Sequence, residues 1–302
     1  MEAVLCWNRK EGKGEVSYYH IDNLYKNADE ILQFREVYAL EKIHGTSAHV
    51  AWKDGQIRFF SGGANHAEFV RLFDEATLTD RFNEMDQPQV TVYGEAYGGK
   101  MQRMKDTYGP DLRFVVFDVK IGNNWLSVPK AEAVALQLGL EFVPYEKVLA
   151  TVDALNDERD IPSALAFRRG IIAPKKREGI VIRPLMELTK NNGERVISKH
   201  KAEEFIETKT MRPVTAERQG QLTEAKAIAD EWVTDMRLTH VLDALGIESD
   251  VTRMGDIMKA MIADVEREAS GEIVESKDAR KAIGKATALL VKSRAKANLE
   301  GR

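Results

Sequence analysis

The chain has 302 residues, enough for two domains, and its 43% hydrophobic and 30% charged residues are typical of a globular protein. A net charge of -4 argues against a wholly basic nucleic-acid binder, and a single cysteine, Cys6, excludes an internal disulfide and a cysteine-based zinc site. The sequence lacks a signal-peptide core and any apolar run of about 20 residues, so we expect a cytoplasmic protein with no membrane partner.

Residues 1 to about 210 mix short strands with helices. Segments rich in β-branched and aromatic residues predict strands at 37–42, 47–53, 57–61, 89–97, 112–121, 125–128, 179–184 and 194–200. Helices are predicted over 67–85 and 130–139. Because strands and helices do not alternate regularly, antiparallel sheets in an α+β domain are favoured over a doubly wound parallel sheet.

After Arg212 and Pro213 the pattern becomes helical. Apolar residues recur every three or four positions along 222–236, 251–265 and 279–290, and each stretch predicts one helical face. Gly246 and Gly271 are expected to separate these helices. We therefore predict two domains: an α+β domain over residues 1–213 and a small all-helical domain over residues 214–302.

Positive charge is concentrated in two stretches. Residues 162–201 contain ten Lys/Arg against three Glu, and residues 277–302 contain eight against Asp278 and Glu300. Surfaces that bind phosphate are built from such local excesses. Each stretch taken alone is explained equally well as a solvated basic face.

Five short segments carry residues suited to nucleotide chemistry, at 41–46 (EKIHGT), 92–96 (VYGEA), 114–118 (FVVFD), 178–183 (EGIVIR) and 199–201 (KHK). Any one of them alone is explained more simply, as a surface turn or a piece of core strand. All five in this order, each at a predicted strand end or turn, are much harder to obtain by chance. Together they predict a single site.

Lys42 is the candidate nucleophile. A lysine amine has a pKa of about 10.4 in water, so it reacts poorly near neutral pH unless burial or neighbouring cations lower that pKa. Lys199 and Lys201 can supply this field, since residues two apart in a strand point to the same face. The same two cations can neutralise phosphate oxygens during transfer.

Attack on a nucleoside triphosphate also needs a divalent ion, and Mg²⁺ takes few direct protein ligands. Glu95 and Glu178 each lie beside a glycine and are the candidate metal partners. Phe117, in an apolar strand, offers a flat face for a purine.

At these residues the sequence resembles the covalent lysine nucleotidyltransferases, which comprise DNA ligases, RNA ligases and mRNA capping enzymes. The segment at 41–46 is most similar to the nucleophile segment of the RNA ligase 2-like group, which includes phage and kinetoplastid editing RNA ligases. His44 occupies a position that is Asp in DNA ligases and capping enzymes. The resemblance runs through residues 38–201, and the helical tail resembles that group's C-terminal domain by type rather than by motif.

The resemblance implies a nucleotidyltransferase (adenylyltransferase) domain with defined site residues. Lys42 would carry AMP, with Lys199 and Lys201 as further catalytic residues that grip the phosphates. Glu95 would contact the ribose and Phe117 would stack on adenine, while Glu95 and Glu178 would hold Mg²⁺, for which Mn²⁺ can substitute. The implied ATP-binding residues are Leu40, Glu41, Lys42, Ile43, Gly45, Arg58, Glu95, Phe117, Glu178, Lys199 and Lys201.

One part of the pattern departs from the family. Ser47 and Ala48 stand where the family usually has Asn, or Arg a little later. Arg58 is the nearest candidate for the basic residue that commonly follows the next strands. The contacts with RNA ends near the nucleotide are therefore the least defined part of the resemblance.

The implied activity is that of an ATP-dependent RNA ligase that joins 3′-OH and 5′-phosphate RNA ends in RNA repair. A monomer is expected, in the cytoplasm, or in the host cytoplasm for a phage-encoded protein. The alternatives are a DNA ligase or capping-type nucleotidyltransferase, and a non-catalytic nucleic-acid-binding homologue. DNA ligases and capping enzymes usually continue into a β-rich barrel, whereas residues 214–302 have the apolar periodicity of helices.

Overall fold

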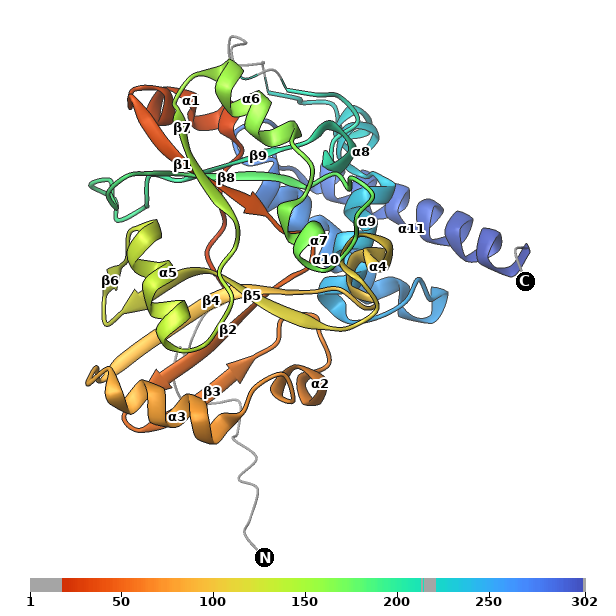
Figure 1. Ribbon diagram of the computed structural model, residues 1–302. Helices are drawn as coiled ribbons and strands as arrows, with labels where there is room; N and C mark the ends of the chain where they lie inside the picture. Colours follow the sequence, from red (N-terminus) through yellow and green to blue (C-terminus); the bar gives the residue numbers. More distant parts are fainter. Residues whose placement is uncertain (1–17, 213, 215–220, 301–302) are drawn as a thin grey trace, which may run out of the picture.

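Two antiparallel sheets form the centre of the molecule in the computed structural model, which describes residues 18–212, 214 and 221–300 (Figure 1). The four-stranded sheet has the order β7-β1-β8-β9, and the five-stranded sheet has the order β3-β2-β4-β5-β6. The strands are β1 (Glu36–Lys42), β2 (Thr46–Lys53), β3 (Gln56–Phe60), β4 (Gln89–Tyr97), β5 (Arg113–Ile121), β6 (Asn124–Trp125), β7 (Tyr145–Leu149), β8 (Gly179–Pro184) and β9 (Ser198–Lys201). The predicted α+β class with antiparallel sheets is confirmed.

Three residues named in the sequence analysis, or bounding its predicted segments, lie outside the described residues: Cys6, Pro213 and Arg302. The domain boundary predicted at 213 therefore stays a prediction.

The segment that follows β1 joins the two sheets. β1 lies between β7 and β8 in the four-stranded sheet, and β2 lies between β3 and β4 in the five-stranded sheet. Residues 43–45 therefore carry the chain from one sheet to the other. A Cβ atom on Gly45 would lie 2.3 Å from the carbonyl oxygen of Ala96, so this crossing requires glycine. The segment around the candidate nucleophile thus stands where the two sheets meet.

Short helices cover the sheets. They are α1 (Leu24–Leu32), α2 (His66–Val70), α3 (Glu75–Glu84), α4 (Lys105–Tyr108), α5 (Val128–Gln137), α6 (Val152–Asp160) and α7 (Ala164–Arg168), with 3₁₀ turns η1 (Met101–Arg103) and η2 (Glu203–Phe205). The largest core cluster packs strand residues such as Val50, Val92 and Val116 against Phe82 of α3 and Ala131 of α5. Burial of this apolar surface is the main force that holds β4 and β5 in place.

The prediction of a single helix over 67–85 is wrong, because the structure has two helices there, α2 and α3. The carboxylate of Asp74 accepts a hydrogen bond from the backbone N–H of Thr77 at 3.3 Å and so caps the start of α3. Phe69, Leu78 and Phe82 are all buried. The apolar spacing therefore continues across the break and conceals it.

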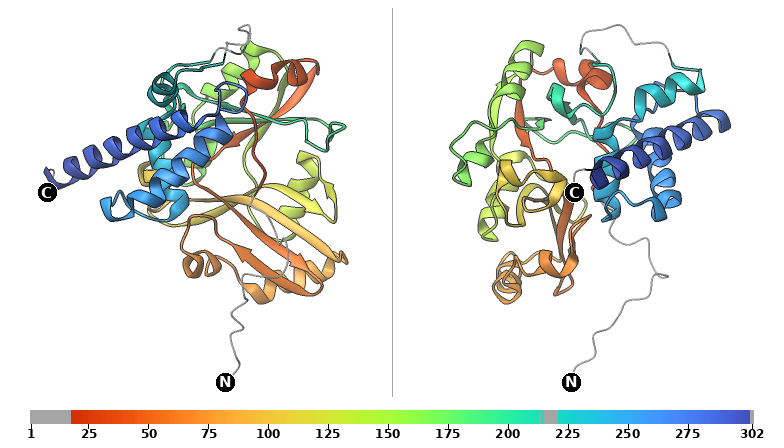
Figure 2. Two further views of the ribbon diagram at one scale, coloured as in Figure 1. Left: turned by 180° about the vertical axis from the view of Figure 1, so that it is seen from behind. Right: turned by 90° about the vertical axis from the view of Figure 1, so that its right-hand side faces the viewer.

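The C-terminal helices form a second group at one side of the sheets (Figure 2). They are α8 (Ala225–Trp232), α9 (Asp235–Leu245), α10 (Met254–Glu268) and α11 (Lys277–Glu300), with the 3₁₀ turn η3 (Val251–Arg253) between α9 and α10. They share a core of their own that includes Ile228, Leu238, Ile257, Met261 and Ile283. Among the described residues, every helix is too short or too polar to span a bilayer.

The boundaries of these helices differ in part from the prediction. The continuous helix expected over 222–236 is interrupted, because the hydroxyl of Thr234 accepts a hydrogen bond from the backbone N–H of Arg237 at 3.2 Å and begins a new helix, α9. Gly246 ends α9 as expected, in the left-handed conformation with φ 64°. Gly271 follows the end of α10 with φ 82°.

The stability of the fold should fall in acid because of His49. This residue lies in β2 with 2% of its surface exposed, and its ring stacks on Phe60 with centroids 4.9 Å apart. Burial lowers the pKa of His49 from 6.5 to about 4. Between these two values the unfolded chain binds more protons than the folded chain, so the free energy of unfolding should decrease as the pH falls. The contribution of His49 to this loss should reach about 3 kcal/mol near pH 4.

Urea denaturation of the wild type and of His49→Phe at about pH 7, 5.5 and 4.5 measures this contribution. The variant should lose less stability than the wild type as the pH falls. Parallel losses in both proteins would show that His49 does not titrate in this way.

Candidate active site

Lys42, the last residue of β1, lies between two adjoining cavities. The Phe117 cavity has a volume of about 500 Å³, and its lining includes Leu40, Glu41, Lys42, Ile43, Glu95, Phe117, Val181 and Lys199. The His240 cavity has a volume of about 470 Å³, and its lining includes Lys42, His44, Gly45, Glu95, Glu178, Lys199, Lys201, Glu207, His240 and Glu268. Lys42, Glu95 and Lys199 line both. The structure therefore brings the predicted site residues other than Arg58 together around one lysine.

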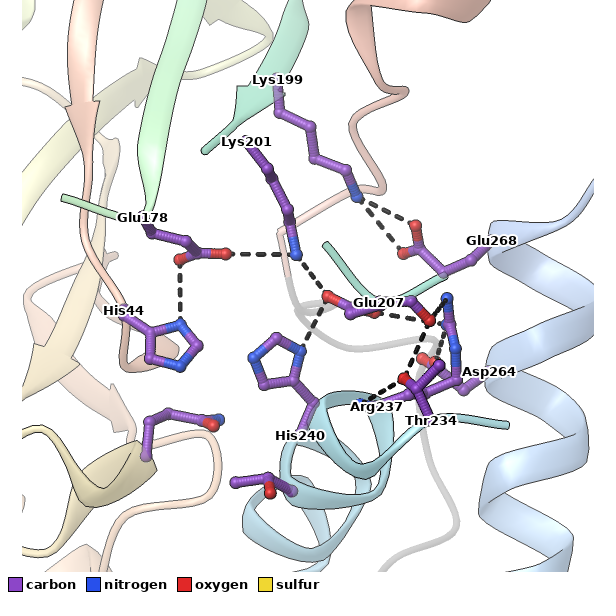
Figure 3. Close-up of polar contacts among 12 residues, drawn as sticks. His44, Glu178, Lys199, Lys201, Glu207, Thr234, Arg237, His240, Asp264 and Glu268 are labelled. Carbon is purple, nitrogen blue, oxygen red and sulfur yellow. Dashed lines mark hydrogen bonds and ion pairs between the residues drawn. The ribbon is translucent and has the colours of Figure 1, made fainter. Parts of the chain in front are cut away.

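Glu178 collects three basic groups at the centre of this site. Its carboxylate accepts a hydrogen bond from the Lys42 amine at 2.8 Å. It also lies 3.2 Å from the His44 ring nitrogen Nδ1 and 3.2 Å from the Lys201 amine (Figure 3). Burial alone would raise the pKa of Glu178, but Lys42 and Lys201 outweigh it and hold the pKa well below its ordinary value. Glu178 is therefore a fixed negative charge that orients the Lys42 amine.

Gly179 brings Glu178 close to the double-lysine strand. Gly179 pairs with Lys201 in the antiparallel register of β8 and β9. Its φ is 149°, and a Cβ atom there would lie 2.2 Å from the carbonyl oxygen of His200. A side chain at this position would push the two strands apart, so glycine is needed for Glu178 to reach Lys201.

Lys199 and Lys201 face the same cavity, as their spacing predicted, but each already has carboxylate partners. Lys201 contacts Glu207 as well as Glu178, and Lys199 contacts Glu268 at 3.0 Å. Burial lowers the pKa of Lys199, with Glu268 opposing the change. For Lys201 the neighbouring carboxylates of Glu207 and Glu178 outweigh burial, so its pKa is raised.

The lysine field expected at Lys42 is therefore arranged differently from the prediction. The Lys42 amine contacts a carboxylate, and Lys201 approaches the opposite oxygen of that carboxylate. The two cations thus share Glu178 instead of facing each other directly. A role of Lys199 and Lys201 in activating Lys42 stays a prediction.

Glu95, on β4, lines the His240 cavity together with Lys42 and Glu178. Burial raises the pKa of Glu95 from 4.5 to about 8, the Lys42 ammonium opposes this rise, and the Glu178 carboxylate adds to it. Within the described part of the chain, no group of three or more His, Cys, Asp or Glu side chains is arranged to hold a metal ion. The two predicted metal partners are Glu95 and Glu178, and a divalent cation can take the place of the proton that burial and the Glu178 charge favour on Glu95. The two residues therefore fit such an ion.

The walls of the Phe117 cavity suit a flat apolar group. Leu40, Phe117 and Val181 come from three different strands and line this cavity together. The ring of Phe117 meets Tyr18 edge to face with centroids 4.9 Å apart. A cavity of this size that is lined by both apolar and charged side chains is typical of sites for small ligands.

Glu41 is turned away from this cavity through its side chain. Its carboxylate accepts hydrogen bonds from the Ser163 hydroxyl and from the backbone N–H of Leu165 at 3.1 Å, at the start of α7. Its own backbone N–H donates to the carbonyl of Pro144 at 2.8 Å. Burial raises the pKa of this carboxyl group. Glu41 therefore fixes the end of β1, which carries Lys42.

Arg58 is the predicted nucleotide contact that the structure does not bring to the site. It lies on β3, an edge strand of the five-stranded sheet, and it lines neither cavity. The exposure of β3 alternates, so that Ile57 and Phe59 are half-buried and Arg58 is exposed. The alternation places Arg58 on the solvent side, and its assignment as an ATP-binding residue finds no support in this geometry.

A comparison with known protein families matches the part of the chain that contains these site residues. The model of the RNA ligase family matches residues 35–201, more than half of the chain. The chain belongs to the RNA ligase family. The match begins before β1 and ends with Lys201, so it contains every segment that the sequence analysis placed in the site. The predicted family membership is confirmed.

Structures of Naegleria gruberi RNA ligase are similar to this RNA ligase family member. A mutant with ATP and Mn matches with a TM-score of 0.49 at 15% identity, a structure with PPi with 0.49 at 16%, and a mutant with AMP and Mn with 0.48 at 15%. Each match covers 63% of this chain and 57% of the Naegleria chain. This chain thus spans little more than half the length of those ligases. No curated protein matches it.

Several residues that line the candidate site of this RNA ligase family member were missed by sequence reasoning. Tyr18 and His20 come from the segment before α1, Glu207 from the stretch after η2, and His240 and Glu268 from α9 and α10. All of them lie outside residues 35–201. None belongs to a motif, because each reaches the site only through the packing of its segment against the sheets.

Proposed function

We propose that this protein is an ATP-dependent RNA ligase that joins 3′-OH and 5′-phosphate ends through a lysyl-AMP intermediate on Lys42, and that it acts in RNA repair. The observation that carries the proposal is the position of the Lys42 amine. It stands between a cavity with apolar walls, sized for a small ligand, and a cavity lined by Lys199 and Lys201. A nucleophile between a base-binding and a phosphate-binding surface suits attack on the α-phosphate of ATP.

The first step forms the bond between the Lys42 nitrogen and the α-phosphorus of ATP. The bond from that phosphorus to the bridging oxygen breaks, pyrophosphate leaves, and the amine gives up its proton. Glu178 holds the amine by a hydrogen bond of 2.8 Å and so fixes its direction of approach. Lys199 and Lys201 are placed to balance the charge on the phosphate oxygens.

Other residues position the nucleotide in this proposal. Phe117 stacks on adenine, the end of β1 at Leu40 and Glu41 borders the base, and Glu95 contacts the ribose. A divalent cation, Mg²⁺ or Mn²⁺, would be held by Glu95 and Glu178 and would neutralise part of the triphosphate charge. The geometry gives Arg58 no part in the proposal.

Two further transfers complete the reaction. AMP passes from Lys42 to the 5′-phosphate of the RNA, and the 3′-hydroxyl then attacks that activated phosphorus and releases AMP. The RNA would be held partly by the C-terminal helices. Lys281, Lys285 and Lys292 lie on α11, the basic last helix, and such a surface attracts the phosphate backbone.

A sealing assay tests whether the substrate is RNA. The protein is incubated with ATP, Mg²⁺ and one of three nicked duplexes: all RNA, RNA at the 3′-OH side only, or all DNA. We expect efficient sealing of the all-RNA nick and weak sealing of the all-DNA nick. Preferred sealing of the all-DNA nick would instead favour a DNA ligase, and labelling of the protein without any sealing would exclude the end-joining proposal.

A further inference from the structure

Lys199 is held by a carboxylate that belongs to none of the site motifs. Glu268, in the last turn of α10, lies 3.0 Å and 3.4 Å from the Lys199 amine through its two oxygens (Figure 3). Both side chains line the Phe117 cavity and the His240 cavity. The ion pair therefore stands at the border of the two cavities, where the phosphates of a bound nucleotide are expected.

The charges at this position make Glu268 a competitor of phosphate. Burial alone would raise the pKa of Glu268, but Lys199 and a hydrogen bond with His20 hold it well below its ordinary value. Glu268 is thus an anion that occupies Lys199 as a phosphate oxygen would. A phosphate oxygen that approached the same ammonium group would be repelled by the Glu268 carboxylate.

Glu268 also has a second partner to which it can turn. One of its oxygens already lies 3.2 Å from the Nδ1 atom of His20. The backbone carbonyl of Glu268 accepts a separate hydrogen bond from the Lys26 amine at 2.7 Å, which holds the end of α10 in place. The side chain can therefore leave Lys199 while its helix stays docked.

The neighbouring pair, Lys201 and Glu207, is built differently. Glu207 is held by His240 at 2.8 Å and by Arg237 at 3.3 Å in addition to Lys201. Lys201, His240 and Arg237 together fix this carboxylate in the network that Figure 3 shows.

Glu268 has close partners in Lys199 at 3.0 Å and His20 at 3.2 Å, and a third basic neighbour, Arg267, only at 3.9 Å. Of the two lysines, Lys199 is therefore the one whose carboxylate partner is more readily exchanged for a phosphate.

We infer that Glu268 is a competitor for the phosphate site, which nucleotide must displace from Lys199, so that α10 sets the affinity of the enzyme for ATP. The inference rests on the proposed function, because it takes Lys199 as a phosphate-binding residue. The inference adds that a residue outside the region matched by the family regulates the binding of nucleotide.

The test measures the dissociation constant of α,β-methylene-ATP with Mg²⁺ by calorimetry. This analogue cannot transfer AMP, so binding is separated from reaction. Glu268→Gln should bind it about five- to tenfold more tightly than the wild type, the scale expected for removing one competing charge in a partly buried pair. The gain in affinity should disappear in the Lys199→Ala background, because that variant lacks the ammonium group for which Glu268 and phosphate compete.

Glu272→Gln is the matched control. Glu272 belongs to the same docking contact, where it pairs with Lys26 and Arg212 and accepts a hydrogen bond from Tyr25, but it lines neither cavity. Unchanged or weaker binding by Glu268→Gln would overturn the inference, and so would an equal gain in Glu272→Gln, which would indicate loosened docking. If the wild type seals RNA but Glu268→Gln binds the analogue no more tightly, the inference is refuted and the proposed function stands. A wild type that binds no analogue and takes no label from ATP refutes the proposed function and the inference with it.

Discussion

Replacement of Lys42 by alanine should abolish the transfer of label from α-labelled ATP to the protein. In the proposed reaction this amine is the group that forms the covalent bond to phosphorus, so the alanine variant has no nucleophile at this position. Lys42→Arg should fail as well, because a guanidinium group stays protonated below a pKa of about 12 and has no free electron pair for attack. Denaturing gel electrophoresis after incubation with labelled ATP and Mg²⁺ measures both results.

Lys53→Ala is the matched control for this experiment. Lys53 is an exposed lysine at the end of β2, the strand that follows the segment joining the two sheets. This variant should accept label at the wild-type level, and circular dichroism should show that all variants are folded. Normal labelling of the Lys42→Ala protein would mean that the nucleophile assignment is wrong.

The part of the site that could be predicted from sequence lies on strand ends. Lys42, Glu95, Glu178, Lys199 and Lys201 all line the His240 cavity. They were found because the same short stretches that carry the chemistry also carry strand-forming residues and glycines, which show up in local sequence. Gly45 and Gly179 serve this purpose through close backbone approaches that no other residue allows.

The contributions of the C-terminal helices could not be predicted in the same way. His240 and Glu268 are ordinary polar residues on amphipathic helices, and their spacing indicates only a solvated face. Their positions depend on how α9 and α10 pack against the sheets. One such contact is the hydrogen bond from the backbone N–H of Gln102 to Asp243 at 2.8 Å. No local pattern encodes a contact between residues so far apart in the chain.

The breaks between helices were missed for a different reason. Asp74 and Thr234 are good N-cap residues, but each lies within a stretch whose apolar spacing continues on both sides. Two helices that pack on one core keep the same buried face, so periodicity alone joins them. The capping side chains decide the break, and their signal in the sequence is weaker than that of the apolar residues.

Glu178→Gln should slow the formation of lysyl-AMP about 100-fold at saturating ATP, the scale of losing one well-placed charged group in a buried site. The change keeps the shape of the side chain but removes the charge that holds the Lys42 amine at 2.8 Å and faces His44 and Lys201. Without that charge the amine loses its fixed direction toward the α-phosphate. Rapid-quench measurement of labelled protein gives the rate, and thermal unfolding shows whether the variant is folded.

Glu207→Gln separates two explanations of that loss. Glu207 contacts Lys201, as Glu178 does, but makes no contact with Lys42. If Glu178 acts by orienting the nucleophile, Glu207→Gln should slow adenylation less than about tenfold, since Lys42 keeps its carboxylate partner. Equal losses in the two variants would show that Glu178 acts through Lys201 instead, by setting the charge that meets the phosphates.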